Sequence, residues 1–576
     1  MEIVFDIETD SLDANIFWCL VAIDENNKVY SYTMDNIDEG LDLLKSADKL
    51  IGHNIIGFDL PVLKKLFNVD LYNPNKVVDT LVLSRLFNPT REGGHSLEKW
   101  GYKLGIAKKD KPDFEVFSKE MLDYCVQDVR VNKKLYEQLQ KESYMFSKES
   151  ILIENEITNI LAEQKANGFK FDLKKAMFLT SDLQNKISNI EYEVHKTFKP
   201  KWIDDKLVKP SLKKDGTLSK VGLTDYEYQD RVKSKDTTPF MRKKLQEFNL
   251  ASRKQIGEYL VDFGWKPKNF TPTGQPIVDE GTLKEIIHIK EAKLIADYLL
   301  YQKRLAQVQS WIEAIDKDDR VHGSVISTGA ITGRMTHIKP NMAQVPSVSS
   351  PYGKECRACW VVDNNYKLVG VDASGLELRM LAHYMADEEY TNEIINGDIH
   401  TTNQRLARLE SRDKAKTFIY ALIYGAGDAK LGSITGGSRK EGQRMREYFI
   451  SNNPSYKNLT NRIQRASAKG YLKGLDGRKI ILRNRYAALN TLLQGAGAIV
   501  MKKALIILNN KLKLNTIDSK FVANIHDEWQ IEVKESQAEF VGETAVQSIE
   551  EAGRHFNLRC PLTGEYKVGG DWSETH

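Results

Sequence analysis

The stretch NIHDEWQIEV, residues 524–533, has apolar residues at alternate positions on both sides of a charged tripeptide. Alternation with a period of two is typical of a strand with one buried face, so the stretch predicts two short strands joined around His526, Asp527 and Glu528. Adjacent carboxylates at such a turn are compatible with a solvated hairpin tip. They also suit a metal site, if another part of the chain supplies a further carboxylate.

A second predicted strand ends in an aspartate in KLVGVDASGLELRML, residues 367–381, where an apolar run leads directly into Asp372. One carboxylate at the end of a buried strand is common. If a sheet brings Asp372 beside Asp527, however, the pair forms a two-metal centre that can activate a 3′-hydroxyl and neutralise a triphosphate. The hairpin would then deliver Asp527 to Asp372.

The segment SRDKAKTFIYALIYGAG, residues 411–427, supplies groups suited to a triphosphate. We expect a long helix over residues 402–424, and a spacing of four places the relevant side chains along one side of it. They are two cations followed by two aromatics: Arg412, Lys416, Tyr420 and Tyr424. His400, in GDIHT, adds either a phosphate donor or an ordinary helix cap. By itself, the pattern also fits an amphipathic helix with a solvated basic end.

Carboxylates form another constellation near the start of the chain. In VFDIETD, Asp6 and Glu8 are two residues apart on a predicted strand, so both project from one face. Asp59 directly precedes the helical LPVLKKL. In YCVQD, Tyr124 and Asp128 have the i, i+4 spacing that places them one above the other on a helix.

The order Asp-x-Glu, then Asp, then Tyr-x3-Asp resembles the DEDDy group of 3′→5′ exonucleases. Such carboxylates suit hard divalent cations, and two-metal sites hold two Mg²⁺ or Mn²⁺ ions about 4 Å apart. The resemblance implies that the ligands are Asp6, Glu8, Asp59 and Asp128. It also implies that Tyr124 orients the attacking water.

The motifs DASGLELR, R-x3-K-x3-Y-x3-Y-G and HDE, in that order, resemble motifs A, B and C of family A DNA polymerases. Four segments are similar in sequence to the replicative polymerases of short-tailed, podovirus-type bacteriophages: DASGLELR, GDIHTTN, SPYGKECRA and GLDGRK. With the exonuclease motifs, the likeness covers nearly the whole chain except residues 199–245.

The polymerase resemblance implies a role for each motif residue. Asp372 and Asp527 would bind two Mg²⁺ ions, with Mn²⁺ as an alternative, helped by the Ala373 carbonyl and supported by Glu528. Arg412 and Lys416 would bind the incoming triphosphate, Lys416 also being a candidate proton donor. Glu377 would fill the space beside the sugar C2′ and exclude a ribose hydroxyl.

Further residues match positions that touch the primer end. Arg334 and Gln344, in TGRMTHIKPNMAQVP, and Asn490 and Gln494 would contact minor-groove acceptors, which are similarly placed in every correct base pair. His526 would contact the primer terminus. For Gln344, Asn490 and Gln494, ordinary polar packing remains an alternative.

The expected fold is an α/β multidomain protein: an RNase H-like exonuclease domain followed by a right-hand polymerase of thumb, palm and fingers. The expected segments are 1–145 exonuclease, 146–320 thumb with a basic insertion at about 199–245, 321–397 palm, 398–478 fingers and 479–576 palm.

Composition limits the cellular setting and the partners. The 576 residues include 83 Lys and Arg against 79 Asp and Glu, so any polyanion must be met by local basic patches. Five scattered cysteines indicate a reducing compartment. The CxxC pair Cys356 and Cys359 lacks the further ligands of a zinc site, and its role stays open.

We find no signal peptide and no run of about 18 apolar residues, so we expect no membrane association. We expect a cytoplasmic location, which would be the cytoplasm of the bacterial host if the chain is phage-encoded.

We therefore expect a DNA-dependent DNA polymerase with 3′→5′ proofreading, acting on primer-template DNA and dNTPs in phage genome replication. A single-subunit RNA polymerase would have neither the exonuclease motifs nor a need for Glu377. A nuclease with a DNA-clamping C-terminal region would not need both Asp372 and Asp527. The insertion at 199–245 fits a solvated loop, direct DNA contact or a thioredoxin-like processivity factor, and the resemblance adds a helicase-primase as a candidate partner.

Overall fold

The computed structural model describes residues 1–575, which form two compact units. One unit combines Met1–Leu173 with the chain from Glu313 onward, and the other is Lys174–Ile312. The first unit contains two large sheets, each with its own helices, and three small two-stranded sheets. The motif residues of the sequence analysis lie in this unit.

The N-terminal sheet has five strands in the order β3-β2-β1-β4-β5. Its strands are β1 (Glu2–Thr9), β2 (Phe17–Asp24), β3 (Val29–Thr33), β4 (Lys49–Gly52) and β5 (Val77–Asp79). The central strand β1 pairs antiparallel with β2 and parallel with β4. Because successive side chains alternate between the faces, Ile3, Phe5 and Ile7 enter one core while Val4 enters the other.

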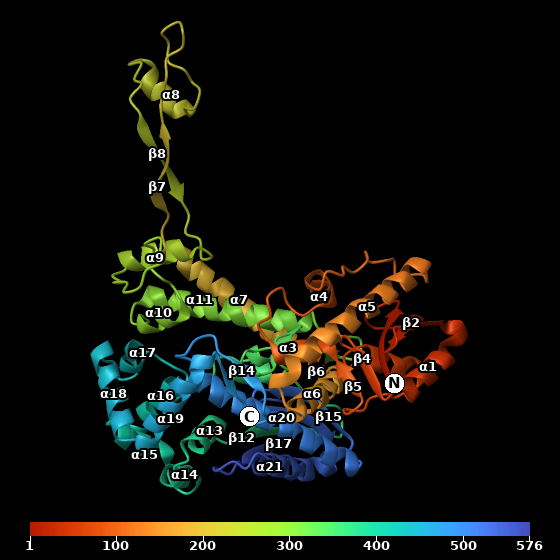
Figure 1. Ribbon diagram of the computed structural model, residues 1–576. Helices are drawn as coiled ribbons and strands as arrows, with labels where there is room; N and C mark the ends of the chain where they lie inside the picture. Colours follow the sequence, from red (N-terminus) through yellow and green to blue (C-terminus); the bar gives the residue numbers. More distant parts are fainter. Residues whose placement is uncertain (576) are drawn as a thin grey trace. The chain divides into compact units, whose positions relative to one another are not determined.

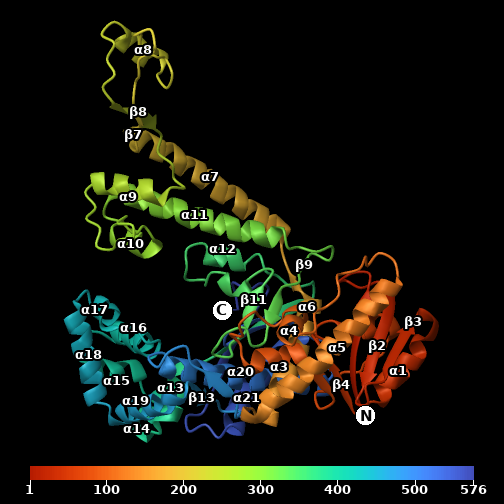
Figure 2. The same cartoon turned by 45° about the horizontal axis from the view of Figure 1, so that its top comes forward.

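Helices cover both faces of this sheet (Figure 2). They are α1 (Ile37–Ser46), α2 (Asp59–Phe67), α3 (Thr80–Phe87), α4 (Leu97–Lys103) and α5 (Lys119–Glu142). The next helix, α6 (Lys148–Asn167), contributes its apolar residues to the largest hydrophobic cluster instead. Apolar residues of α1 and α2 pack with Phe5, whereas Cys125 and Val129 of α5 pack with Val4. Asp6 and Glu8 share the alternation of Val4 and therefore face the side of α5.

The second sheet has four antiparallel strands in the order β15-β16-β12-β17. Figure 1 labels three of them, β12, β15 and β17. They are β12 (Tyr366–Ala373), β15 (Ser519–Ile525), β16 (Glu528–Lys534) and β17 (Gly564–Gly569). Two long helices pack with each other and contribute to this core, namely α20 (Ala488–Leu514) and α21 (Ala538–His555). Strands β15 and β16 form the hairpin that the alternation at 524–533 predicts.

The polar face of this hairpin is buried, which corrects the expectation of alternating buried and solvated positions. Asn524, Gln530 and Glu532 are all buried. The Glu532 carboxylate accepts hydrogen bonds from Arg320 at 2.8 Å and Lys520 at 3.3 Å. A buried polar face needs partners from distant segments, and alternation in the sequence carries no information about them.

Helix α20 alone among the described helices is long and apolar enough to cross a membrane by length and composition. The sequence shows no long uninterrupted apolar run here, because Lys502 and Lys503 lie within the helix. Of its most hydrophobic window, 78% is buried inside the protein. We therefore interpret α20 as a core helix, consistent with its place in the largest hydrophobic cluster.

Shorter elements complete this unit. The strands are β6 (Phe169–Lys170), β9 (Arg320–Val321), β10 (Ser324–Ile326), β11 (Thr336–Ile338), β13 (Tyr471–Lys473) and β14 (Lys479–Ile481). The α-helices are α12 (Gly353–Arg357), α13 (Leu376–Met385), α14 (Glu388–Ile395), α15 (Ile399–Ala407), α16 (Arg412–Ile423), α17 (Asp428–Ser433), α18 (Arg439–Ser451) and α19 (Pro454–Ala466). The 3₁₀ turns are η1 (Met34–Asn36), η2 (Ser143–Met145), η3 (Met342–Gln344), η4 (Ser467–Lys469) and η5 (Glu535–Gln537).

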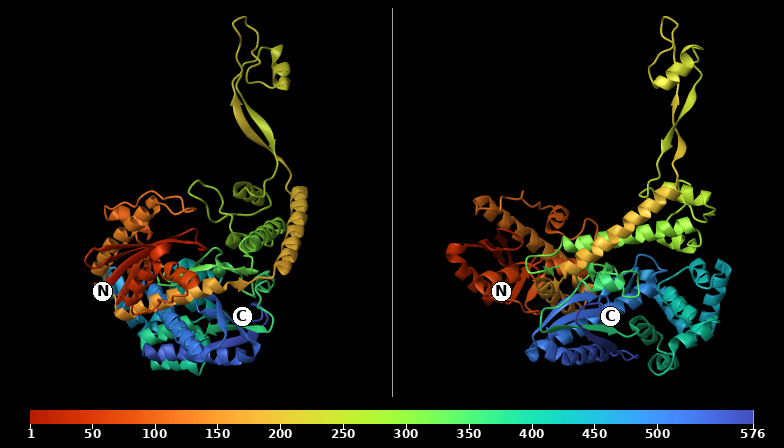
Figure 3. Two further views of the ribbon diagram at one scale, coloured as in Figure 1. Left: turned by 90° about the vertical axis from the view of Figure 1, so that its right-hand side faces the viewer. Right: turned by 180° about the vertical axis from the view of Figure 1, so that it is seen from behind.

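The second unit is helical with one long hairpin. Its helices are α7 (Leu173–Thr197), α8 (Asp225–Val232), α9 (Arg253–Asp262), α10 (Glu280–Glu285) and α11 (Lys290–Ile312). Its core gathers Phe198, Phe248, Tyr259 and Trp265. The insertion forms a two-stranded ribbon, β7 (Lys201–Val208) with β8 (Phe240–Gln246), which extends away from α7 and α9 and carries α8 near its far end (Figure 3).

Candidate active sites

The first site is built on β1. Asp6 and Glu8 project from the same face of this strand, as their spacing predicts. Asp59, the first residue of α2, is buried, and its Oδ1 accepts a hydrogen bond from the backbone N–H of Ile7 at 3.2 Å. The bond ties the Asp59 carboxylate to the residue between Asp6 and Glu8.

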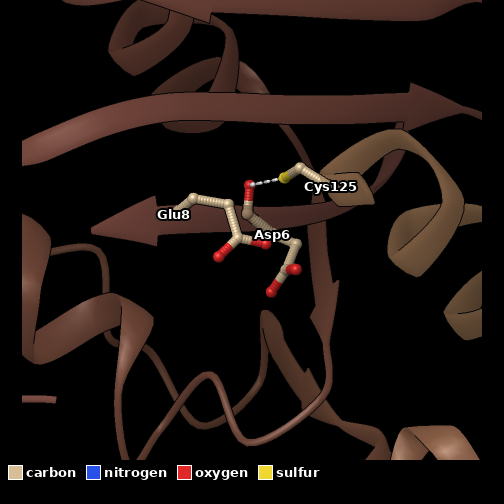
Figure 4. Close-up of side chains that lie close together, drawn as sticks. All are labelled: Asp6, Glu8 and Cys125. Carbon is tan, nitrogen blue, oxygen red and sulfur yellow. Dashed lines mark hydrogen bonds between the residues drawn. The ribbon is translucent and has the colours of Figure 1, made fainter. Parts of the chain in front are cut away.

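Helix α5 brings the remaining residues to the same strand. Tyr124 and Asp128 lie one turn apart on α5, which contacts β1 and β2, and both side chains are buried. Between them, Cys125 donates a hydrogen bond through Sγ to the backbone oxygen of Asp6 at 3.6 Å (Figure 4). Its thiol also lies within 4.8 Å of ligand oxygens of Asp6 and Glu8.

The charge of this site is unbalanced. Burial, reinforced by the neighbouring Asp128, raises the pKa of Glu8 to about 8. Burial likewise raises the pKa of Asp59 to about 7, and burial together with Asp59 raises the pKa of Asp6 well above its usual value. Burial and mutual repulsion disfavour the charged forms of these carboxylates. A bound divalent cation would favour the charged forms, so the cluster suits such an ion. The buried Asp128 Oδ1 also has no hydrogen-bond partner among residues 1–575.

Lys108 enters the same site, and the sequence analysis missed it. Its ammonium group forms an ion pair with Asp128 Oδ2 and lies 4.7 Å from the centroid of the Tyr124 ring. Lys108 belongs to the irregular segment between α4 and α5. A single lysine in a basic stretch, KKDK, carries no periodic signal that would have identified it.

The second site lies where β12 meets the β15–β16 hairpin. In the antiparallel register, Asp372 lies opposite Glu528, and the backbone N–H of Ala373 donates to the Asp527 carbonyl at 3.2 Å. Asp527 and His526 form the turn itself, with His526 at a positive φ of 58°. The register therefore brings the aspartates of two motifs, 155 residues apart, to adjacent strand ends.

The two carboxylates of the hairpin have different surroundings. Burial and the charge of Glu377 raise the pKa of Asp527 to about 6. The Glu528 Oε1 atom instead accepts hydrogen bonds from Trp572 Nε1 at 2.6 Å and Gln530 Nε2 at 2.7 Å, with Arg357 Nη1 at 3.5 Å. These bonds give Glu528 a supporting position, and nothing in the spacing of the sequence marks Trp572 or Arg357 as its partners.

The expected helix over 402–424 is two helices, α15 and α16. Arg408 has a left-handed φ of 53°, and Ser411 starts α16 by accepting a hydrogen bond from the Lys414 N–H. Arg412, Lys416 and Tyr420 lie on α16, and Tyr424 follows its last residue. Four-residue spacing detects the helix, but this break arises from capping and a left-handed residue that spacing cannot reveal.

Asp398, which the sequence analysis did not select, links these two helices. Its Oδ1 caps α15 by accepting from the His400 N–H at 3.1 Å, and its Oδ2 pairs with Arg412 Nε at 2.6 Å. His400 itself lies 6.2 Å from Tyr420, measured between ring centroids. Burial, together with the charge of Arg412, lowers the pKa of His400, so its ring is neutral near pH 7.

Glu377 is the centre of a small polar cluster beside the second site. Its Oε1 accepts from Arg334 Nη2 at 3.0 Å and from the Tyr424 hydroxyl at 2.9 Å. Burial, and the repulsion of Arg334, lower the pKa of His526. The Glu377 carboxylate therefore binds Arg334 and Tyr424, and its charge also acts on His526.

The remaining expected residues are distributed around this cluster. Asn490 and Gln494 lie one turn apart on the first part of α20, and both are half-buried. Gln344 is exposed at the end of η3. Gln344 and Gln494 are accessible, as a DNA contact requires, whereas the Asn490 Oδ1 atom is buried and has no hydrogen-bond partner in residues 1–575.

Comparison with known proteins gives two family matches. Residues 1–143 match the family described as 3'-5' exonuclease, and residues 222–574 match DNA polymerase family A. The second match alone covers more than half of the chain.

Individual relatives agree with these families. The DNA-directed DNA polymerases of Enterobacteria phage T3 and Escherichia phage T7 are each 34% identical over 703 aligned residues, with 100% of both chains covered. DNA polymerase I of Helicobacter pylori strain 26695 is 25% identical, with 98% of this chain and 62% of the relative covered.

A solved structure described as the POL domain of Pol1 from M. smegmatis in complex with DNA primer-template and dNTP has a TM-score of 0.79. It is 18% identical to this chain, and the match covers 100% of this chain and 95% of that one. At this identity, the likeness concerns the fold.

Proposed function

This chain belongs to DNA polymerase family A as a DNA-directed DNA polymerase with a 3′-5′ exonuclease domain, and we propose how its two sites divide the work. Polymerases and exonucleases of these families use divalent metal ions, generally Mg²⁺. In our proposal, Asp372, Asp527 and the Ala373 carbonyl hold two such ions in the polymerase site, with Mn²⁺ as an alternative. The observation that carries the assignment is the register that sets Asp372 beside the Asp527 turn.

When bound, the ions supply Lewis acidity for the primer 3′-oxygen and for the triphosphate. The protein's own groups bind and orient the nucleotide. Arg412 and Lys416, one turn apart on α16, bind the phosphates, and Lys416 forms no ion pair with any residue in 1–575 that would have to break first. Tyr420 and Tyr424 offer faces for the base, and the half-buried His400 donates a further hydrogen bond.

Sugar selection is assigned to Glu377. Its carboxylate is fixed by Arg334 and the Tyr424 hydroxyl, so it cannot move aside for an added 2′-hydroxyl without losing both bonds. In our proposal, five residues contact the primer-template duplex at the primer end: Arg334, Gln344, Asn490, Gln494 and His526. All of these groups can donate to minor-groove acceptors.

The N-terminal site removes mismatched 3′ ends in this proposal. Asp6, Glu8, Asp59 and Asp128 hold two divalent ions, a role consistent with their raised pKa values and with the partnerless Asp128 Oδ1. Tyr124 holds the attacking water through its hydroxyl. The two sites are built on different sheets, so either one can be inactivated separately.

A double dissociation on one labelled primer-template tests the assignment. Asp372→Ala or Asp527→Ala should abolish extension and keep degradation, because each change removes a metal ligand from the polymerase site. The pair Asp6→Ala and Glu8→Ala should abolish degradation and keep extension. Extension that survives Asp527→Ala would reject the polymerase site, and loss of both activities from either change would indicate one shared site.

We further propose phage genome replication in the host cytoplasm as the setting, from the likeness to the phage T3 and T7 polymerases. The ribbon of residues 201–246 is assigned to DNA contact, with a thioredoxin-like processivity factor as the second candidate. The ribbon has twelve Lys and Arg against seven Asp and Glu, and it exposes Trp202 by 68% and Tyr226 by 82%. A basic surface with exposed aromatics favours DNA. A helicase-primase remains a candidate partner of the whole enzyme.

A further inference from the structure

Lys108 occupies a position that the metal chemistry of the exonuclease site does not require. Its ammonium group pairs with Asp128 Oδ2, and the two side chains are only 17% and 5% exposed. The same group lies over the Tyr124 ring, 4.7 Å from its centroid. One lysine therefore contacts both Tyr124 and Asp128 of α5.

The segment that carries Lys108 is anchored at several points. Gln127 Nε2 donates to the Ala107 carbonyl at 2.8 Å, which fixes the residue next to Lys108. Trp18 Nε1 donates to the Phe114 carbonyl at 3.0 Å, and the Phe114 ring lies edge-on to Tyr124 with 6.2 Å between centroids. The segment 104–118 is thus hydrogen-bonded to both α5 and β2, and Lys108 lies next to one of these fixed points.

The two carboxylate oxygens of Asp128 have different surroundings. Its Oδ2 is taken by Lys108, whereas its buried Oδ1 has no hydrogen-bond partner in residues 1–575. The unpaired oxygen is available as a ligand for a cation. A second divalent ion close to the occupied oxygen would meet the ammonium at short range, and like charges a few ångströms apart repel strongly at a buried site.

We propose that Lys108 is a positioning residue that holds Asp128 in the metal-free site and must leave it before the second divalent ion binds. The proposal rests on the exonuclease role proposed above. Lys108 thereby raises the metal concentration at which degradation begins and leaves the polymerase site unaffected. Its effect is on metal binding, not on the rate once both ions are bound.

The test compares Lys108→Met with Lys109→Met. Lys109 is the neighbouring residue with the same charge, but its ion pair with Asp123 at 3.5 Å is half exposed and lies outside the site. Both changes are made in an Asp372→Ala, Asp527→Ala background, so that the polymerase site contributes no metal binding. Electron paramagnetic resonance then measures the number of Mn²⁺ ions bound and their dissociation constants.

We expect Lys108→Met to bind the second Mn²⁺ roughly three- to tenfold more tightly, the size expected for removing one partly solvated charge, and Lys109→Met to match the parent. The Mg²⁺ concentration for half-maximal degradation should fall by a similar factor, with the rate at saturating Mg²⁺ unchanged. Lys108→Arg, which keeps the charge, should retain the weak binding. Unfolding temperatures of all variants report on folding independently.

Unchanged Mn²⁺ affinity in Lys108→Met would overturn the proposal. So would a lower saturated rate with unchanged affinity, because that result makes Lys108 a contact to the DNA. The exonuclease role has its own control in Asp6→Ala with Glu8→Ala. If that pair keeps degradation and the full number of Mn²⁺ ions, the proposed function fails, whatever Lys108→Met shows.

Discussion

At the scale of single residues, the candidate functional side chains are held by hydrogen bonds, and most of their partners lie in distant segments. Glu377 bonds Arg334 and Tyr424, and Glu528 bonds Gln530 and Trp572. A carboxylate fixed in this way would discriminate by shape, as we propose for Glu377, because moving it breaks bonds that cost about 1–3 kcal/mol each when left unmade. The properties of each residue therefore depend on a partner as much as on its own type.

Glu377→Ala should admit ribonucleotides. The change opens space beside the sugar and releases Arg334 and Tyr424 from their shared acceptor. We expect the preference for dNTP over the matching ribonucleotide to fall by about tenfold or more, corresponding to at least about 1.4 kcal/mol. Single-nucleotide insertion with each sugar measures the ratio, and an unaltered ratio would remove Glu377 from sugar selection.

His383 makes the fold sensitive to acid. It is buried, and its Nδ1 accepts the backbone N–H of Arg559 at 3.2 Å, which requires that nitrogen to be unprotonated. Burial, then the charge of Arg559, lowers the pKa of His383 to about 4. Between pH values of about 4 and about 6.5, the unfolded chain, whose histidine pKa is about 6.5, binds more protons than the folded chain. The free energy of unfolding therefore rises with pH across this range, and this stability is lost as the pH falls through it.

His383→Asn should reduce that acid sensitivity, because the amide oxygen can accept the same bond and does not titrate. The expected difference from the parent, in the change of unfolding free energy between pH 7 and pH 5, is about 2 kcal/mol. Thermal unfolding at both pH values measures it. His195→Asn, an exposed site, is the control and should follow the parent. Parallel curves for the parent and His383→Asn would contradict the interpretation.

At the scale of elements, the sequence predicted strands and helices well where a local period was strong. Strand β1 with Asp6 and Glu8 on one face, helix α5 with Tyr124 and Asp128, and the hairpin around Asp527 all follow from spacing. The break between α15 and α16 did not, because one left-handed residue at Arg408 decides it. Lys108 and Trp572 also escaped prediction, since their partners lie in segments to which no periodicity points.

Trp572→Phe tests how the hairpin depends on its neighbours. The change removes the N–H that donates to Glu528 at 2.6 Å and keeps an aromatic ring beside Arg357, which now lies 4.4 Å from the Trp572 ring. A hydrogen bond to a charged group contributes about 1.5–3 kcal/mol. We expect extension to slow roughly tenfold, with an altered Mg²⁺ requirement. Degradation by the same protein is the internal control, and equal loss of both activities would indicate general unfolding instead.

At the scale of the whole molecule, one buried charge cluster joins segments that are far apart in sequence. Glu154 of α6 accepts from Arg478 and from Lys502 of α20, both at 2.6 Å, and all three side chains are buried. Arg478 also pairs with Asp476 at 2.7 Å. The helix that follows the exonuclease domain is thereby tied to the core helix beside the polymerase site. Removing one partner of such a group leaves a buried charge without compensation.

Glu154→Gln should therefore destabilise this unit by about 3–5 kcal/mol. Glu163→Gln on the same helix is the matched control, because its ion pair with Lys513 at 2.9 Å is about half exposed and should contribute about 1 kcal/mol or less. Denaturant unfolding of both variants measures the difference. Equal stability of the two would show that the buried cluster does not hold the helices together.

The ribbon of residues 201–246 is the part of the molecule for which neither motif nor resemblance assigned a single role. Its two strands bury little, since β7 and β8 are mostly exposed, and its excess of basic residues lies on β8 and in the segment between the strands, whereas β7 has two lysines and two aspartates. An element that contributes so little to a core can be removed without unfolding the rest. We therefore expect the role of the ribbon to lie in what it contacts, and duplex phosphates would match its charge.

Replacing residues 203–238 with a short Gly/Ser linker should spare insertion of a single nucleotide, because no proposed metal or triphosphate ligand lies there. It should shorten the product made in one binding event, measured with a trap that captures released enzyme. If the ribbon contacts DNA directly, the intact protein should lose product length as salt rises, more steeply than the deletion variant, because each phosphate contact releases a counterion. Added thioredoxin that lengthens products only in the intact protein would favour the protein partner instead, and unchanged product length after deletion would mean that the ribbon is a solvated loop with no part in processivity.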